Sequence, residues 1–215
     1  MKLQIALDDI TYEGALTLLG QIADSIDIIE LGTPFAYTYP LSAIGELKKA
    51  YPGKEVFADY KILDGGEFMA NLAFGAGADM VSVSASAHEG TIAGAVKAAK
   101  KQGRKVLADM MGLPLERIAE RSAAAARLGA DYLCVHTSLD VKDADDPLAC
   151  IREAKRGAKG KALVAAAGGI RLETLPRILE AAPDLVIVGG AIIKSPDPKE
   201  TAARMAELVR GRGMA

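Results

Sequence analysis

Eight short apolar segments recur along the chain at intervals of about 26 residues, and this repeat limits the fold more than any other feature. Each segment has the composition of a buried strand, and the stretch before the next one shows the 3.6-residue period of an amphipathic helix. The apolar segments are residues 3–7, 26–29, 55–58, 80–83, 105–108, 132–135, 162–165 and 185–188. The helical patterns are residues 13–23, 41–50, 65–74, 91–101, 115–128, 147–157, 174–181 and 198–210. The repeat therefore predicts eight consecutive strand–helix units.

The apolar segments are continuous rather than alternating, which is typical of parallel strands that helices cover. Eight right-handed strand–helix units close into a (β/α)8 TIM barrel at about this chain length. The main alternative is an open doubly wound sheet, which usually carries a GxGxxG turn after its first strand. Residues 8–11, Asp-Asp-Ile-Thr, do not form that turn. No linker or low-complexity segment interrupts the pattern, so we predict a single α/β domain over residues 1–215.

An aspartate stands before the apolar part of four predicted strands, and these residues are Asp27, Asp79, Asp131 and Asp184. Around Asp79 and Asp131 the chain repeats one motif, Gly-Ala-Asp. The repetition predicts one common form of helix-to-strand connection.

Composition narrows the class of protein. The formal net charge is −2, so no overall positive field favours nucleic acid or an anionic membrane as a partner. No apolar run approaches the roughly 20 residues of a membrane span, and the N-terminus lacks the regions of a secretion signal. The two cysteines, Cys134 and Cys150, have no CxxC spacing, and Cys134 lies in an apolar run typical of the core. We therefore expect a cytoplasmic protein that acts on a small molecule.

The segment 59–64, Asp-Tyr-Lys-Ile-Leu-Asp, places charges at the end of a predicted buried strand. Side chains alternate along a strand, so Asp59 and Lys61 are expected on one face and Tyr60 on the other. In a (β/α)8 barrel the carboxyl ends of all strands meet at one face, where active sites form. The other ionisable residues predicted at this face are Asp8, Glu30, Asp109 and His136. His88, by contrast, is expected to cap a helix or lie in a surface loop.

Two glycine pairs, Gly168-Gly169 and Gly189-Gly190, follow the seventh and eighth predicted strands. Backbone N–H groups at glycine-rich turns bind anions, and the loops after strands seven and eight often bind phosphate in these barrels. The glycines could instead serve tight turns alone. A pair at both expected loops favours phosphate, so a small phosphorylated metabolite is predicted as the substrate.

The acids and the histidine indicate chemistry beside the phosphate. Glu30 and Asp59 are candidates for binding a hard cation such as Mg²⁺, which prefers oxygen ligands, with Mn²⁺ as the alternative. The metal and Lys61 would stabilise an oxyanion such as an enediolate. His136 would transfer a proton near neutral pH. Asp109 is either catalytic or a group that orients Lys61 or the metal ligands.

The pattern Asp-x-Lys-x-x-Asp at residues 59–64, with Asp8 and the glycine pairs, resembles the orotidine 5′-monophosphate decarboxylase suprafamily. Within it, residues 28–34 (IIELGTP), 58–64 (ADYKILD), 135–137 (VHT) and 167–170 (AGGI) resemble the 3-hexulose-6-phosphate synthases. The likeness extends over residues 3–209. It implies a Mg²⁺-dependent aldol addition of formaldehyde to D-ribulose 5-phosphate through an enediolate, giving D-arabino-hex-3-ulose 6-phosphate.

The resemblance also assigns roles to residues. The metal-binding acids would be Glu30 and Asp59, the substrate-binding pair Asp8 and Lys61, and the proton-transfer group His136. The substrate phosphate would lie against Gly168, Gly169, Gly189 and Gly190. The resemblance further implies a homodimer with shared active sites, in which Asp64 joins the catalytic residues of the neighbouring subunit.

Three other functions stay open. The related 3-keto-L-gulonate 6-phosphate decarboxylases carry arginines at two positions where this chain has Leu139 and Gly190, and this difference favours the synthase. A Schiff-base aldolase would use Lys61 as its nucleophile, but the flanking acids favour a charged lysine over the neutral amine. A non-catalytic sugar-phosphate-binding protein would keep the pocket without turnover.

Overall fold

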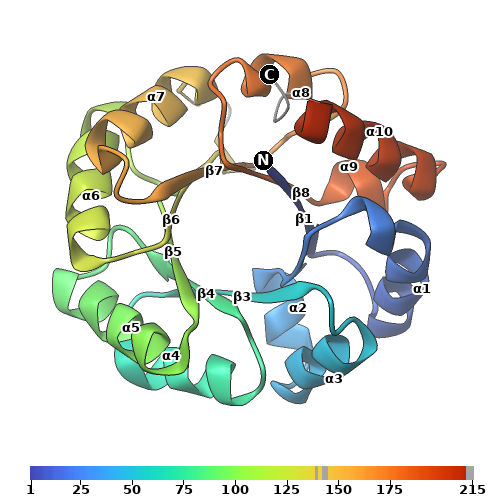
Figure 1. Ribbon diagram of the computed structural model, residues 1–215, viewed down its shortest axis with the longest axis horizontal. Helices are drawn as coiled ribbons and strands as arrows, with labels where there is room; N and C mark the ends of the chain where they lie inside the picture. Colours follow the sequence, from blue (N-terminus) through green and yellow to red (C-terminus); the bar gives the residue numbers. More distant parts are fainter. Residues whose placement is uncertain (139, 142–144, 212–215) are drawn as a thin grey trace.

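Eight parallel strands pair in chain order and close into a barrel, because β8 also pairs with β1 (Figure 1). The computed structural model describes residues 1–138, 140–141 and 145–211. The strands are β1 (Lys2–Leu7), β2 (Ile28–Leu31), β3 (Glu55–Ile62), β4 (Met80–Ser84), β5 (Lys105–Asp109), β6 (Tyr132–His136), β7 (Leu163–Ala167) and β8 (Leu185–Val188). The (β/α)8 architecture predicted from the repeat is therefore confirmed.

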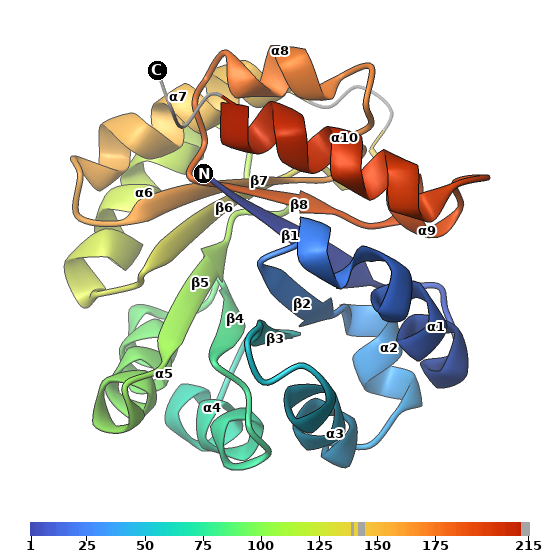
Figure 2. The same cartoon turned by 45° about the vertical axis from the view of Figure 1, so that its right-hand side comes forward.

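Helices form a ring outside the strands (Figures 1 and 2). They are α1 (Tyr12–Ile22), α2 (Thr33–Thr38), α3 (Ser42–Ala50), α4 (Gly66–Gly75), α5 (Glu89–Gln102), α6 (Leu115–Leu128), α7 (Pro147–Ala158), α8 (Leu175–Leu179), α9 (Gly190–Ile193) and α10 (Pro198–Gly211). Each predicted helical segment contains a helix. The repeat does not predict α2 and α9, because six and four residues are too few to show a helical period. Within the described residues, no helix has the length and apolar character that crossing a membrane requires.

Each strand is buried on two faces. Outward-facing side chains such as Leu3, Ile5 and Leu7 join the large core between the barrel and the helices. Inward-facing side chains fill the barrel, and they include Ala6, Ile28, Phe57, Met80, Leu107, Tyr132 and Leu185. The same alternation turns buried polar side chains inward, namely Gln4, Glu30, Asp59, Ser82 and Asp109. The position of a polar residue in this alternation thus decides whether its side chain enters the barrel.

Four aspartates, one before each even-numbered strand, make the same contact. Its carboxylate accepts the backbone N–H of the second residue of an odd-numbered strand, at 2.8–2.9 Å. The donor and acceptor pairs are Leu3 with Asp27, Val56 with Asp79, Val106 with Asp131 and Val164 with Asp184. These four aspartates, two of them in the Gly-Ala-Asp repeat, therefore fix neighbouring strands to one another at the amino-terminal end of the barrel.

A small charged cluster, Lys2–Glu55–Lys105, lies at this amino-terminal mouth. Glu55 accepts hydrogen bonds from Lys105 Nζ, at 2.7 Å, and from Lys2 Nζ. Burial acts to raise the pKa of Glu55, but the hydrogen bonds from Lys105 and Lys2 outweigh it and hold the pKa below its ordinary value. One ionised acid is thus shared between two cations at this end of the barrel.

Candidate active site

A cavity of about 750 Å³ opens at the carboxyl ends of the strands. Most residues that the sequence predicts for the site line it, and these are Asp8, Glu30, Asp59, Lys61, Asp109, His136, Gly168, Gly169, Gly189 and Gly190. They come from β1, β2, β3, β5, β6, β7 and β8, or from the loops that follow these strands. Closure of the barrel therefore brings together groups that are far apart in the sequence.

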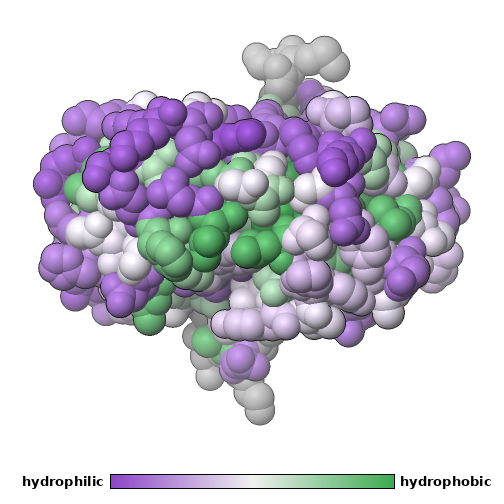
Figure 3. All heavy atoms as spheres, turned by 90° about the horizontal axis from the view of Figure 1, so that it is seen from below, coloured by the Kyte–Doolittle hydropathy of each residue, from purple (hydrophilic) through white to green (hydrophobic). Residues whose placement is uncertain are grey.

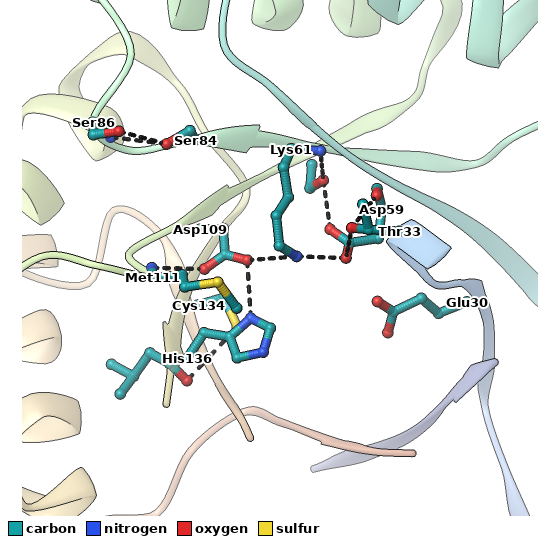
Figure 4. Close-up of polar contacts among 12 residues, drawn as sticks. Glu30, Thr33, Asp59, Lys61, Ser84, Ser86, Asp109, Met111, Cys134 and His136 are labelled. Atoms are coloured by element: carbon teal, nitrogen blue, oxygen red, sulfur yellow. Dashed lines mark hydrogen bonds and ion pairs between the residues drawn. The ribbon is translucent and has the colours of Figure 1, made fainter. Parts of the chain in front are cut away.

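Lys61 lies between two carboxylates (Figure 4). Its Nζ is 2.5 Å from Asp59 Oδ2 and 3.2 Å from Asp109 Oδ2. Burial acts to lower the pKa of Lys61, but the charges of Asp59 and Asp109 outweigh it and hold the pKa above its ordinary value. The ammonium form is therefore favoured at neutral pH, where it can stabilise an oxyanion and is a poor amine nucleophile.

The backbone at Lys61 departs from a regular strand. Its φ is 43°, in the left-handed region that costs energy for a residue with a Cβ, and the pairing of β3 with β4 shifts between Ala58 and Ile62. Ser82 stabilises this bulge, because its Oγ accepts from Lys61 N and donates to Asp59 Oδ1, both at 2.7 Å. The strand continues to Ile62, beyond the predicted 55–58. Asp59 and Lys61 meet as expected, while Tyr60 packs against the outer core.

Asp109 connects the lysine to the histidine. Its Oδ2 lies 3.0 Å from His136 Nδ1, and its Oδ1 accepts the Met111 N–H at 2.8 Å. Burial acts to raise the pKa of Asp109, but the hydrogen bond to His136 and the charges of His136 and Lys61 hold the pKa below its ordinary value. Of the roles that the sequence leaves open, these contacts favour the orientation of Lys61 and His136 by Asp109. A substrate proton would then be transferred at His136 Nε2.

Glu30 is a buried acid without an ion pair among the described residues. Gln4 Nε2 donates to Glu30 Oε2 at 2.6 Å. Burial raises the pKa of Glu30 well above its ordinary value, and the charge of Asp59 adds to this shift. Burial followed by the charge of Asp59 also raises the pKa of Asp8. The side of the cavity formed by β1, β2 and β3 therefore holds more acidic groups than Lys61 can pair with.

A hard cation fits this side of the cavity. The buried Oε1 of Gln4, beside Glu30, has no hydrogen-bond partner among the described residues. A carboxylate with a raised pKa next to an unpartnered oxygen is an environment that a divalent cation would complete. Glu30 and Asp59 would hold the ion. Asp59 Oδ2 also accepts hydrogen bonds from Lys61 Nζ and Thr33 Oγ1, so a cation would share this carboxylate with them.

The glycine pairs, which follow β7 and β8, form a second wall of the cavity. Gly168 has a φ of 90°, and a Cβ added to it would lie 2.1 Å from the Thr137 carbonyl oxygen, so only glycine fits there. A Cβ added to Gly169 or Gly190 would have no atom within 4 Å. The backbone at these turns is thus open to the cavity, as a phosphate would need.

Two cations that the sequence analysis missed line the same wall. Arg171 and Lys194 border the cavity, and each follows a glycine pair by only a few residues. Lys194 Nζ also lies 3.0 Å from Asp9 Oδ2. A basic residue shortly after each glycine pair was the available signal. Thr33, Gln4 and Ser82 carried no such signal, because their roles depend on contacts between strands.

Other predicted residues lie away from the cavity. Asp64 is exposed in the loop after β3 and accepts the Gly65 N–H at 2.7 Å, so this chain alone does not bring it into the site. His88 caps α5 by accepting the Gly90 N–H, as predicted. Cys134 lies buried at the cavity lining and Cys150 lies buried in α7, both as free thiols. Leu139 falls outside the described residues.

Comparison with known proteins agrees with this architecture. Residues 1–205 match the model of the orotidine 5′-phosphate decarboxylase / HUMPS family. The chain is 40% identical to the 3-hexulose-6-phosphate synthase of Bacillus subtilis, over 97% of this chain and 99% of the relative. It is 41% identical to that of Mycobacterium gastri, over 95% and 98%.

A solved structure gives the same result. The crystal structure of the Salmonella typhimurium 3-hexulose-6-phosphate synthase superimposes with a TM-score of 0.90 at 38% identity, over 98% of this chain and 99% of that one. Sequence and structure thus agree over nearly the full length of each chain. The chain belongs to the orotidine 5′-phosphate decarboxylase / HUMPS family, among relatives named 3-hexulose-6-phosphate synthase.

Proposed function

We propose that this protein catalyses the reversible aldol addition of formaldehyde to D-ribulose 5-phosphate, giving D-arabino-hex-3-ulose 6-phosphate. The observation that carries the proposal is a charged Lys61 between Asp59 and Asp109, with His136 on the same acid. This arrangement suits a reaction that removes a proton beside a carbonyl and stabilises the resulting oxyanion. The names of the relatives supply the substrate class.

In this proposal His136 removes a proton from C1 of ribulose 5-phosphate, and the electron pair of the C–H bond forms the enediolate. Lys61 stabilises the developing negative oxygen. The enediolate carbon then attacks formaldehyde, a C–C bond forms, and protonated His136 returns the proton to the formaldehyde oxygen. Asp109 keeps Lys61 and His136 oriented throughout.

Magnesium, held by Glu30 and Asp59, would supply additional positive charge for the substrate oxygens. Asp8, close to Asp59 on the same side, would accept hydrogen bonds from substrate hydroxyl groups. The phosphate would lie against the glycine pairs and beside Arg171 and Lys194. Activity should therefore be lost on exhaustive chelation and return with Mg²⁺, whereas full activity of the metal-free protein would remove the metal from the proposal.

A homodimer would bring Asp64 to a partner's site. Exposed hydrophobic side chains lie near Asp64, with Leu63 64% exposed and Phe68 of α4 67% exposed. Hydrophobic surface gathers on the side of the molecule that α3 and α4 form (Figure 3). Covering this surface with a second copy would remove it from water. Phe68→Asp should therefore give a monomer in sedimentation experiments, with activity reduced together with dimerisation.

A substrate panel tests the function directly. The purified protein is assayed for formaldehyde consumption with ribulose 5-phosphate, and for CO₂ release from 3-keto-L-gulonate 6-phosphate. We expect the first activity to exceed the second. Predominant CO₂ release would identify a decarboxylase, and tight binding of sugar phosphates without turnover would identify a binding protein. Borohydride trapping of a substrate at Lys61 would instead support the Schiff-base route.

A further inference from the structure

Asp109, Cys134 and His136 form a compact group of unlike side chains inside the barrel (Figure 4). Asp109 ends β5, and its register partner on β6 is Cys134. His136 follows Cys134 by two residues on the same strand, so both side chains face inward. One ligand atom from each of the three residues lies within 4.8 Å of the other two. Among the described residues, this is the one group of three histidine, cysteine or acidic side chains whose ligand atoms lie so close together.

We propose that this group binds a thiophilic divalent cation of the zinc type, at a site separate from the oxygen-lined position of Glu30 and Asp59. A thiolate, an imidazole and a carboxylate are all zinc ligands, whereas Mg²⁺ prefers oxygen. Zinc is usually four-coordinate, and three protein ligands leave one position for water or a substrate atom. All three residues line the cavity, which supplies that position.

The charges and atoms of the bound state balance. A metal–sulfur bond forms, the S–H bond of Cys134 breaks, and the proton leaves to solvent, so no oxidant or reductant is needed. The carboxylate of Asp109 and the thiolate of Cys134 together neutralise a dication. A neutral set is favourable at this position, because Asp109 and Cys134 are both almost fully buried.

Metal binding at this site would compete with the contacts seen in the free protein. Asp109 Oδ2 lies 3.2 Å from Lys61 Nζ and 3.0 Å from His136 Nδ1. A cation bound here takes both Asp109 and His136 as ligands, so it withdraws them from orienting Lys61 and from moving protons. The site is therefore inhibitory, and an excess of Mg²⁺ does not reverse the inhibition because the two cations use different ligand types.

Cadmium titration tests the binding directly, without an activity assay and without depending on the proposed reaction. Metal-free protein is titrated with Cd²⁺, and the ultraviolet thiolate-to-cadmium charge-transfer band is recorded. We expect a band that saturates at one equivalent. Cys134→Ser should abolish the band and weaken metal binding at least about tenfold. Cys150→Ser, which changes the other buried thiol, is the matched control and should keep the band.

A band that survives in Cys134→Ser, or one that disappears only in Cys150→Ser, overturns the assignment. A second measurement avoids any dependence on the folding of a variant. X-ray absorption at the zinc edge of the zinc-loaded wild-type protein should show one sulfur at about 2.3 Å with nitrogen and oxygen at about 2.0–2.2 Å. A shell of nitrogen and oxygen alone would contradict the proposal.

Discussion

The two mouths of the barrel arrange the same kinds of charged group in opposite ways. At the amino-terminal mouth one acid, Glu55, lies between two lysines. At the carboxyl-terminal mouth one lysine, Lys61, lies between two acids, while burial raises the pKa of Glu30 and of Asp8 nearby. The first mouth satisfies its acid within the chain. The second holds an excess of acids, so a cation or a polar substrate can complete it.

The two mouths also differ in backbone conformation. Glu55 lies at the regular start of β3, whereas Lys61, near the end of the same strand, adopts a left-handed conformation within a bulge. Strain of this kind persists where surrounding contacts hold it, here the hydrogen bonds of Ser82. One mouth thus pairs its charges within the chain on regular backbone, whereas the other holds a strained, charged lysine that faces the cavity.

Replacing one lysine at each mouth should give the largest difference in activity between two variants. Lys61→Ala should lower kcat/KM for the aldol reaction by about 10³-fold, because the oxyanion loses its charged donor. Lys105→Ala is the matched control at the other mouth, and it should keep kcat/KM near the wild-type value. Steady-state assays of formaldehyde consumption measure both. Similar losses in the two variants would show that the mouths are not functionally distinct.

Replacing the histidine should give the next largest effect. His136→Asn removes the group that transfers the proton and should lower kcat by about 10²-fold or more. The same variant should stop the exchange of the C1 proton of ribulose 5-phosphate with deuterium from the solvent, followed by NMR without formaldehyde. Exchange at the wild-type rate would exclude His136 as the base.

The cations of the phosphate wall should contribute less. Arg171→Ala and Lys194→Ala should each raise KM for ribulose 5-phosphate about tenfold with little change in kcat, because each removes one charged contact to the phosphate. Ribulose without its phosphate serves as the control substrate, and its kcat/KM should not change in either variant. A loss that is equal for both substrates would place these residues elsewhere in the reaction.

The smallest expected effect is a change in stability at the amino-terminal mouth. Glu55→Gln should lower the free energy of unfolding at neutral pH by about 1 kcal/mol or less, because both lysine partners are partly exposed. The pKa of Glu55 is lowered on folding, so its contribution is present above the unfolded value of about 4.5 and is lost as the pH falls through the folded value. Denaturant unfolding at several pH values should show a weaker acid dependence in Glu55→Gln, with activity unchanged.

Local pattern predicts much of this molecule. The repeat of apolar segments and helices predicts the (β/α)8 barrel, because each strand–helix unit shows its period within a short window. The alternation along β3 places Asp59 with Lys61, and the common position of strand ends places Glu30 and His136 at one mouth. These properties depend on the order of residues along single strands.

The sequence pattern does not predict the side-chain contacts between strands. The sequence leaves two roles for Asp109, and only the pairing of β5 with β6 brings His136 to one side of it, with Lys61 on the other. Ser82 gains its role because β4 lies beside the bulge of β3. Gln4 becomes a partner of Glu30 through the neighbouring strands β1 and β2.

The sequence by itself determined the number of units, the common face of Asp59 and Lys61, and the set of ionisable groups at the carboxyl-terminal mouth. Only the tertiary structure decided which group contacts which, and therefore which charges are balanced. The physical reason is the sequence separation over which each interaction acts. Strand period and apolar burial act between residues a few positions apart, whereas the partners of Lys61 and Glu30 are set by register and bulges that exist only in the closed barrel.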